Sequence, residues 1–336
     1  MYLIDRAKTM KAIVYHNYGS PDVLKCEDIE KPIPKDNEVL IKVRAASLNP
    51  LDWHFMRGVP YIVRIIAGLG KPKFIGIGAD VAGQVEAVGK TVTQFKPGDA
   101  VLGGCRGAFA EYACASESEL VAKPDNVTFE QASTARIAGL TALQGLRKKG
   151  HLQSGQKVLI NGASGGVGTF AVQIAKSFGA EVTGVCSTRN LEMVRSIGAD
   201  RVIDYTKRDF TQKDFTEGER SYDIILDLIG NHSLSAYRRI LNPKGILVSA
   251  GGPSGRWRFG LARGIRARAR SMLGSQKFVG ILVRSTRKDL ITLHDLLKAG
   301  KMIPIIGRQY SLSEVPEAIR YLEEGHARGK IVITVR

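Results

Sequence analysis

The chain has 336 residues, 44% of them hydrophobic, which is enough to bury a large core in about two domains. Because no run of about 18 apolar residues occurs, we expect a soluble protein and exclude a membrane span, a disordered tail and a fibre. The formal net charge of +17 attracts polyanions in general, but zinc-finger spacings, RNP-type aromatic motifs and basic heptads are absent, so dedicated nucleic-acid binding is not expected.

The N-terminus and the cysteines indicate the compartment. The first nine residues, MYLIDRAKT, precede a second methionine and lack the long apolar core and small-residue cleavage site of a signal peptide, so we interpret them as a start-site extension. The four cysteines form no CxxC pair, which is typical of reduced thiols. We therefore expect a cytoplasmic protein.

The elements fall into two patterns along the chain. Residues 11–123 contain short alternating or β-branched runs between closely spaced Pro and Gly, which predicts an antiparallel, barrel-like β domain. From 156 to 283 strands alternate with helices, which predicts a doubly wound parallel sheet. Residues 289–335 return to helix and strand elements that form neither a further repeat nor a separate domain, and we expect them to rejoin the first domain.

The stretch LINGASGGVG, residues 159–168, lies between a buried-looking strand and a helical pattern. This context indicates a dinucleotide-binding loop with the spacing Ala163-x-Gly165-x-x-Gly168. Gly165 would let the backbone approach a pyrophosphate, and Gly168 would let the helix pack on the strand. The helix N-terminus would offer free N–H groups to the anion. The residues expected at the cofactor are Ala163, Ser164, Gly165, Gly166, Val167 and Gly168.

The preferred dinucleotide depends on the end of the next strand, where a carboxylate would bind the ribose 2′-hydroxyl of NADH. No carboxylate occurs from Val182 to Leu191. Ser187, Thr188 and Arg189 instead supply hydroxyls and a cation suited to a 2′-phosphate, which predicts NADPH. The alternative is that Arg189 only caps a solvated helix end.

Six motifs resemble the medium-chain dehydrogenase/reductase superfamily, and the resemblance extends over nearly the whole chain from Met10. They are GADVAGQVEAVG (78–89), FKPGDAV (95–101), GAFAEYA (107–113), AGLTA (138–142), GASGGVG (162–168) and GKIVI (329–333). The resemblance implies an α/β fold with a GroES-like β-barrel catalytic domain, 1–127 and 286–336, around an NADP-binding Rossmann domain, 128–285. It also implies an active site in the cleft between the domains, and a homodimer.

The zinc ligands of that superfamily are missing. Asn49 stands where the zinc enzymes carry a cysteine, Ala79-Asp80 stands where they carry His-Glu, and the four-cysteine lobe is absent. The chain thus resembles the zinc-free quinone oxidoreductase branch, which includes zeta-crystallin and the enone reductases. The activity implied is hydride transfer from NADPH to a quinone or an α,β-unsaturated carbonyl compound.

The resemblance also implies catalytic positions. Asn49 would hydrogen-bond the substrate or the ribose, Asp52 would hold the loop, and Thr141 would approach the nicotinamide. Several zinc-free members carry a tyrosine two residues beyond Asp52, where this chain has His54, and an imidazole can relay a proton in its place. The alternatives are capping or turn roles for the first three, and a structural role for His54.

Further positions concern the cofactor. Tyr205 matches a tyrosine near the adenosine phosphate in the quinone oxidoreductases, or it is a core residue at a strand end. Gly251 and Gly252 follow the fifth Rossmann strand, where the backbone would pass under the nicotinamide ribose. Arg328 and Lys330 would add cations near the cofactor, and plain surface charge explains them equally well.

Two alternatives to the reductase remain open at this point. One is an NADPH-binding protein that acts mainly through RNA or anionic-membrane contact, and the other is an enoyl-thioester reductase. Residues 255–274 favour some anion contact, because they read as a basic amphipathic helix with Arg263, Arg266, Arg268 and Arg270 beside Leu261, Ile265, Ala269, Met272 and Leu273. The alternative for this segment is a surface helix that docks on its own domain.

Overall fold

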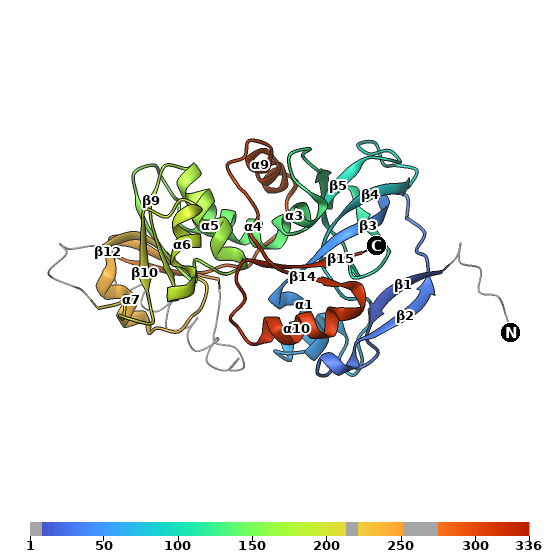
Figure 1. Ribbon diagram of the computed structural model, residues 1–336, viewed down its shortest axis with the longest axis horizontal. Helices are drawn as coiled ribbons and strands as arrows, with labels where there is room; N and C mark the ends of the chain where they lie inside the picture. The colour runs from blue at the N-terminus through green and yellow to red at the C-terminus, as the bar shows by residue number, and fades with distance from the viewer. Residues whose placement is uncertain (1–8, 213–220, 251–274, 336) are drawn as a thin grey trace. The chain divides into compact units, whose positions relative to one another are not determined.

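The computed structural model describes residues 9–212, 221–250 and 275–335, which belong to two compact units (Figure 1). Unit 1 comprises Met1–Ala138, Ser285–Gly300 and Pro304–Arg336, and unit 2 comprises Gly139–Arg284 and Lys301–Ile303. The first boundary falls within helix α4 (Ala135–Leu143), later than the boundary after residue 127 drawn from the sequence.

Unit 1 is built on a seven-stranded sheet in which antiparallel pairs predominate. Its strands are β3 (Glu38–Leu48), β4 (Asp80–Val88), β5 (Ala100–Gly104), β6 (Tyr112–Ser116), β7 (Leu120–Ala122), β14 (Ile306–Ser311) and β15 (Lys330–Thr334). They follow the order β14-β15-β3-β4-β5-β7, and β6 also pairs with β3. A separate antiparallel ribbon joins β1 (Thr9–Val14) to β2 (Lys25–Glu30).

Short helices connect these strands. They are η1 (Pro21–Val23), α1 (Pro50–Arg57), α2 (Ile62–Ala67), η2 (Glu117–Glu119), α3 (Phe129–Ser133), α9 (Arg287–Lys298), η6 (Leu312–Glu314) and α10 (Val315–Glu323). Helix α3 packs against β3 and β4, which explains why residues 128–138 belong to unit 1. The core between sheet and helices is aliphatic, and fully buried side chains such as Ile41, Val81 and Phe109 occupy it.

The last strand of the chain completes the sheet of unit 1. Strand β15 pairs antiparallel with β3, with Ile331 opposite Leu48 and Thr334 opposite Ala45. On its other side β15 pairs in parallel with β14. This register brings Lys330 to the end of β3, where the chain turns into α1.

Unit 2 contains a six-stranded sheet in which every pair is parallel, as predicted from the alternation of strands and helices. The order is β10-β9-β8-β11-β12-β13. The strands are β8 (Lys157–Asn161), β9 (Glu181–Cys186), β10 (Arg201–Asp204), β11 (Tyr222–Asp227), β12 (Leu241–Ser249) and β13 (Lys277–Gly280). The helical elements are the π-helical turn η3 (Gln144–Lys149), α5 (Gly166–Ser177), η4 (Thr188–Asn190), α6 (Leu191–Ser196) and α7 (Leu234–Ile240).

The central strands β8, β9 and β11 of unit 2 are buried along nearly their whole length, because helices cover both faces of a doubly wound sheet. Leu159, Val185 and Ile225 form the centre of its core. The order of the strands, read from β8, is that of a Rossmann fold, and the predicted fold class is thereby confirmed. Within the described residues, no helix is long and apolar enough to cross a bilayer.

Candidate functional site

The first candidate site lies in unit 1, at the turn from β3 into α1. Asn49 is extended and precedes the helix, and Pro50 occupies the first helical position, where its missing N–H is not needed. The carboxylate of Asp52 accepts a hydrogen bond from the Asn49 backbone N–H at 2.7 Å. Asp52 therefore fixes the start of α1, as expected for a residue that holds this loop.

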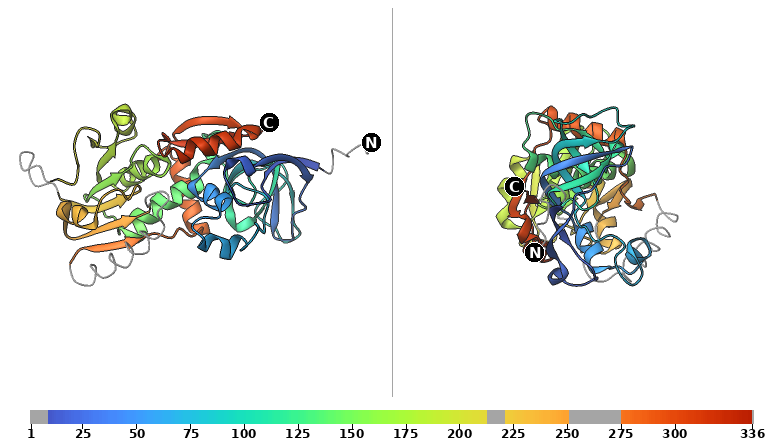
Figure 2. Two further views of the ribbon diagram at one scale, coloured as in Figure 1. Left: turned by 90° about the horizontal axis from the view of Figure 1, so that it is seen from below. Right: turned by 90° about the vertical axis from the view of Figure 1, so that its right-hand side faces the viewer.

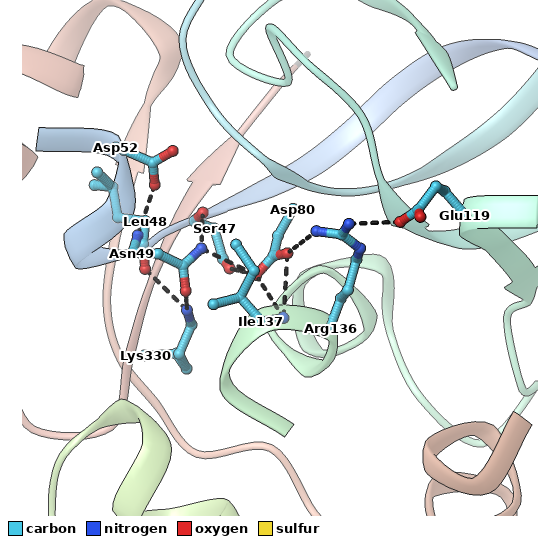
Figure 3. Close-up of polar contacts among 9 residues, drawn as sticks. All are labelled: Ser47, Leu48, Asn49, Asp52, Asp80, Glu119, Arg136, Ile137 and Lys330. Carbon is cyan, nitrogen blue, oxygen red and sulfur yellow. Dashed lines mark hydrogen bonds and ion pairs between the residues drawn. The ribbon is translucent and has the colours of Figure 1, made fainter. Parts of the chain in front are cut away.

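The side-chain amide of Asn49 is bound on both ends (Figure 3). Its Nδ2 donates to the Ser47 carbonyl oxygen at 3.2 Å and to Asp80 Oδ2 at 3.0 Å, which uses both amide hydrogens. Its Oδ1 accepts from the Lys330 ammonium at 2.6 Å. Only one lone pair of Oδ1 is left, so Asn49 can accept a further hydrogen bond but cannot donate one.

Lys330 is buried, with only 4% of its surface exposed, and its ammonium also donates to the Leu48 carbonyl oxygen at 2.8 Å. Plain surface charge, one of the two interpretations drawn from the sequence, is therefore wrong for this residue. The ammonium lies inside unit 1 because the pairing of β15 with β3 places Lys330 beside Leu48 and Asn49.

Asp80, at the start of β4, links this cluster to the surface. It is fully buried and accepts from Asn49, from the hydroxyl of Ser47 at 3.4 Å and from the backbone N–H of Ile137 at 3.3 Å. The Arg136 guanidinium lies 3.7 Å from it and pairs at 2.5 Å with the half-buried Glu119. Figure 3 shows the resulting chain of polar contacts from Glu119 to Lys330.

Burial governs the proton affinities in this cluster. It raises the pKa of Asp52 to about 7, in spite of the Asn49 N–H, and the nearby negative charge of Asp80 acts in the same direction. Burial also lowers the pKa of Lys330, against the opposing effect of the Asp80 and Asp52 carboxylates. Burial raises the pKa of Asp80 as well, against the opposing effect of Lys330 and Arg136. The raised pKa of Asp52 places the protonation change of its carboxyl group near neutral pH.

His54 lies on α1, half-buried and stacked on Trp53 with ring centroids 3.8 Å apart. Its Nδ1 lies 2.7 Å from the carbonyl oxygen of Val59 and must carry the hydrogen of that bond. In the neutral ring Nε2 is consequently the basic nitrogen. Burial lowers the pKa of His54, so the imidazolium is a stronger acid than a solvated one.

The second candidate site is the glycine loop of unit 2, between β8 and α5. A Cβ on Gly168 would stand 2.1 Å from the Gly162 carbonyl oxygen, so only glycine permits this approach of helix and loop. A Cβ on Gly165 would meet nothing closer than 3.5 Å. Among the described residues, therefore, no close neighbour requires glycine at position 165, and its bare backbone leaves space beside the loop for a ligand.

The start of α5 provides N–H donors. Thr169 donates the first bond, to the carbonyl oxygen of Gly165, so the N–H groups of Gly166, Val167 and Gly168 precede the hydrogen-bond ladder of the helix. Ala163 is fully buried, and its N–H donates to Val185 of the next strand, which fixes the base of the loop. This geometry suits an anionic phosphate.

The ends of β9 and β10 lie beside this loop in register, with Asp204 opposite Cys186. Asn190 is buried and its Nδ2 donates to Ser164 of the loop at 3.2 Å and to Ser187 at 3.1 Å. Thr188 donates to Asp204 at 2.5 Å, while Arg189 is exposed. The interval from 182 to 191 has no carboxylate, but the neighbouring strand supplies one.

The carboxylate of Asp204 accepts hydrogen bonds from nearby threonines. One of its oxygens accepts from Thr188 and the other from the hydroxyl of Thr206 at 2.7 Å, and these bonds hold its pKa below the usual range. Tyr205 follows and is 49% exposed, so it is a surface residue and not a core tyrosine.

Four predicted residues and the basic segment remain. Thr141 is buried on α4 in unit 2, and Arg328 is exposed in unit 1. Gly251, Gly252 and the basic segment 255–274 lie outside the described residues.

Sequence reasoning missed three contributors. Asn190 directly follows Arg189, but its link to Ser164 depends on the loop's path. The contact of Asp204 with Thr188 could be inferred only from the strand order, because the two residues are 16 positions apart in the sequence. Arg136 lies next to the AGLTA motif and carried no signal of its contact with Asp80.

The residues at Asn49 and Asp80 do not fit a zinc ion. They supply one amide and one carboxylate, and an ammonium stands 2.6 Å from the amide oxygen, where it would repel a dication. Among the residues that the structure describes, no group of three or more His, Cys, Asp or Glu side chains could hold a metal.

Two domain families match the chain. The alcohol dehydrogenase GroES-like domain matches residues 35–125, and the zinc-binding dehydrogenase family matches residues 197–333. Full-length relatives are similar as well. The chain is 34% identical to the chloroplast envelope quinone oxidoreductase homolog of Arabidopsis thaliana, over 97% of this chain and 98% of that protein.

A second relative is the 2-methylene-furan-3-one reductase of Solanum lycopersicum, with 34% identity over 96% of this chain and 79% of that protein. Among solved structures, the quinone oxidoreductase from Coxiella burnetii is 32% identical and superposes with a TM-score of 0.85, covering 98% of this chain and 100% of that one.

Proposed function

The chain belongs to the quinone oxidoreductase branch of the medium-chain dehydrogenase/reductase superfamily, and we propose that it is an NADPH-dependent, zinc-independent reductase of quinones or α,β-unsaturated carbonyl compounds. The observation that carries the proposal is the glycine loop, where Gly168 admits no side chain and Gly165 leaves the backbone open at a helix N-terminus. The relatives' names support the acceptor class and favour an enzyme over a polyanion-binding protein.

The loop would hold the pyrophosphate of the dinucleotide through the N–H groups of Gly166, Val167 and Gly168. Ser187 and the exposed Arg189 stand at the end of β9, where the adenosine ribose binds in this fold. Thr188 and Thr206 bind both oxygens of Asp204, which leaves this carboxylate a single acceptor site, on Oδ2, for a ribose 2′-hydroxyl. An exposed guanidinium at this place favours the 2′-phosphate of NADPH.

When bound, the reduced nicotinamide supplies a hydride to the activated carbon of the acceptor. The reduced acceptor then needs a proton, and we assign its delivery to Nε2 of His54. Val59 fixes the Nδ1–H tautomer, so Nε2 is the only ring nitrogen that can take up a proton and release it. Asn49 would accept a hydrogen bond from the substrate or the ribose at the remaining lone pair of its Oδ1. Lys330 and Asp80 hold its side-chain amide in place.

Steady-state kinetics tests the proposal. NADPH oxidation is followed with a panel of quinones, 2-alkenals, vinyl ketones and enoyl-CoA thioesters, before and after treatment with a chelator, alongside elemental analysis for zinc. We expect turnover with quinones or enones that survives chelation. Turnover confined to enoyl-CoA would instead support an enoyl-thioester reductase, and one firmly bound zinc per chain would refute zinc independence.

Cofactor preference has its own test. Arg189→Asp turns an attractive contact into a repulsive one, so Kd for NADPH should rise by roughly 10-fold to 100-fold while Kd for NADH changes little. Arg239→Asp, at an exposed cation on α7, is the matched control. Equal affinity of the unmodified protein for the two cofactors would contradict the preference. The homodimer also remains a proposal, which sedimentation velocity would check.

A further inference from the structure

One segment of unit 1 reverses the usual distribution of polar and apolar side chains. It runs from 61 to 75, includes α2, and is called the apolar loop here. Seven of its large apolar side chains are exposed, and five of them expose more than half of their surface: Tyr61 (70%), Ile62 (55%), Ile65 (66%), Ile66 (70%) and Leu69 (76%). Figure 2 shows α2, in the blue part of the colour scale, at the surface of unit 1. Single exposed apolar residues are ordinary, but a contiguous group indicates an interaction site.

The one cation on α2 points inward. Nε of Arg64 donates to the Gly58 carbonyl oxygen at 3.0 Å, and its guanidinium lies over the rings of Tyr18 and Tyr61, at 4.6 and 5.0 Å. A surface helix of a soluble domain normally turns its charge to water and its isoleucines to the core. Here Arg64 anchors the helix to unit 1, and Ile65 and Ile66 are left facing outward.

The apolar loop itself carries charge of a single sign. No Asp or Glu occurs between Asp52 and Asp80, whereas four cations do, of which Arg57 pairs with Glu323. Lys71 and Lys73 are exposed, and neither forms an ion pair with a described residue. The exposed Arg106 lies over the ring of Phe74 at 3.5 Å and adds a further positive charge at the edge of the loop.

We propose that the apolar loop is a docking site for an anionic membrane surface. Ile65, Ile66 and Leu69 would enter the boundary between headgroups and acyl chains, and Lys71 and Lys73 would lie among anionic headgroups. This combination of outward apolar side chains with flanking cations is the pattern of interfacial membrane binding. A second copy of this chain is a poor occupant, since a two-fold contact would bring the same cations of both copies together.

Vesicle sedimentation tests this proposal, which is independent of the catalytic one. The purified chain is mixed at low salt with phosphatidylcholine vesicles or with vesicles that also contain phosphatidylglycerol. We expect binding to the anionic vesicles, weakened by salt. Ile65→Ser/Ile66→Ser should lower the partition coefficient by roughly 10-fold or more, because buried methylene groups are lost. Lys71→Gln/Lys73→Gln should lower it by roughly 25-fold, at about fivefold per charge.

Ile33→Ser/Ile291→Ser is the matched control, because it removes two exposed isoleucines elsewhere in unit 1 and should leave binding unchanged. All variants should retain NADPH oxidation in solution, which shows that they fold. Leu69→Trp reports insertion directly, because tryptophan fluorescence should shift to shorter wavelengths when the side chain enters the anionic vesicles. Absence of binding by the unmodified chain, or equal binding by Ile65→Ser/Ile66→Ser, would overturn the proposal. So would a change of that variant from dimer to monomer without vesicles, which would assign the loop to a second copy.

Discussion

Replacing Asp52 by asparagine isolates the energetic cost of a buried carboxyl group. Asparagine keeps a side-chain oxygen that can accept from the Asn49 N–H, so the start of α1 is preserved. It removes only the ionisation of a group whose pKa burial raises to about 7, compared with a usual value of about 3.9.

The sign and size of the effect follow from proton linkage. Between about pH 5 and pH 7 the folded chain keeps a proton on Asp52 that the unfolded chain has lost, so the free energy of unfolding falls as the pH rises. Two pH units at about 1.4 kcal/mol each give a loss of roughly 3 kcal/mol between pH 5 and pH 8. In Asp52→Asn this loss is absent, because no proton is bound or released at that position.

Urea denaturation at pH 5 and pH 8, followed by circular dichroism, measures the difference. The change in free energy of unfolding between the two pH values should be smaller in Asp52→Asn than in the unmodified chain by roughly 3 kcal/mol. Asp125→Asn, at an exposed carboxylate, should reproduce the unmodified chain. If Asp52→Asn shows the same change between pH 5 and pH 8 as the unmodified chain, the carboxyl group is ionised throughout and the reasoning fails.

Three further results are expected. Gly168→Ala should destabilise unit 2 by roughly 2–4 kcal/mol in urea unfolding and abolish NADPH binding, because its Cβ would meet the Gly162 carbonyl oxygen at 2.1 Å. Gly165→Ala, with no neighbour closer than 3.5 Å, should weaken binding without that loss, and equal destabilisation by both would count against this. His54→Phe should lower kcat by roughly 100-fold, and kcat of the unmodified enzyme should increase as the pH falls towards the lowered pKa of His54. An unchanged kcat would leave His54 a structural residue. Iodoacetamide should modify the exposed Cys26 first, since burial raises the pKa of Cys105 to about 12 and those of Cys114 and Cys186 to about 11, and mass spectrometry of the labelled peptides would reveal any other order.

The sequence alone predicted the features that residues close together in the chain determine. The glycine loop could be recognised because a strand, a turn and a helix follow one another within about 20 residues, and the parallel sheet could be recognised from its alternating pattern. Asn49 and Asp52 were identified through the resemblance to the dehydrogenase/reductase superfamily, which a few neighbouring residues carry at this position. These predictions needed no knowledge of which strands are neighbours.

Contacts between distant strands could not be predicted in this way. Lys330 reaches Asn49 only because β15 pairs with β3, 281 residues earlier in the sequence, so it was indistinguishable from a surface cation. Asp204 approaches Thr188 for the same kind of reason, through the pairing of β10 with β9. The pKa of Asp52 depends on burial by the assembled unit, which no motif encodes.

The pairing of β15 with β3 also constrains when this protein can mature. A ribosome makes residues 139–284 before it makes β14 and β15, so unit 2 can fold while unit 1 still lacks the strand that lies between β3 and β14. Until β15 emerges, β3 presents an unpaired edge to other nascent chains, and the Asp80 and Asp52 carboxylates lack their ammonium. A chain truncated before β15 would therefore keep its glycine loop and be a candidate for aggregation and proteolysis.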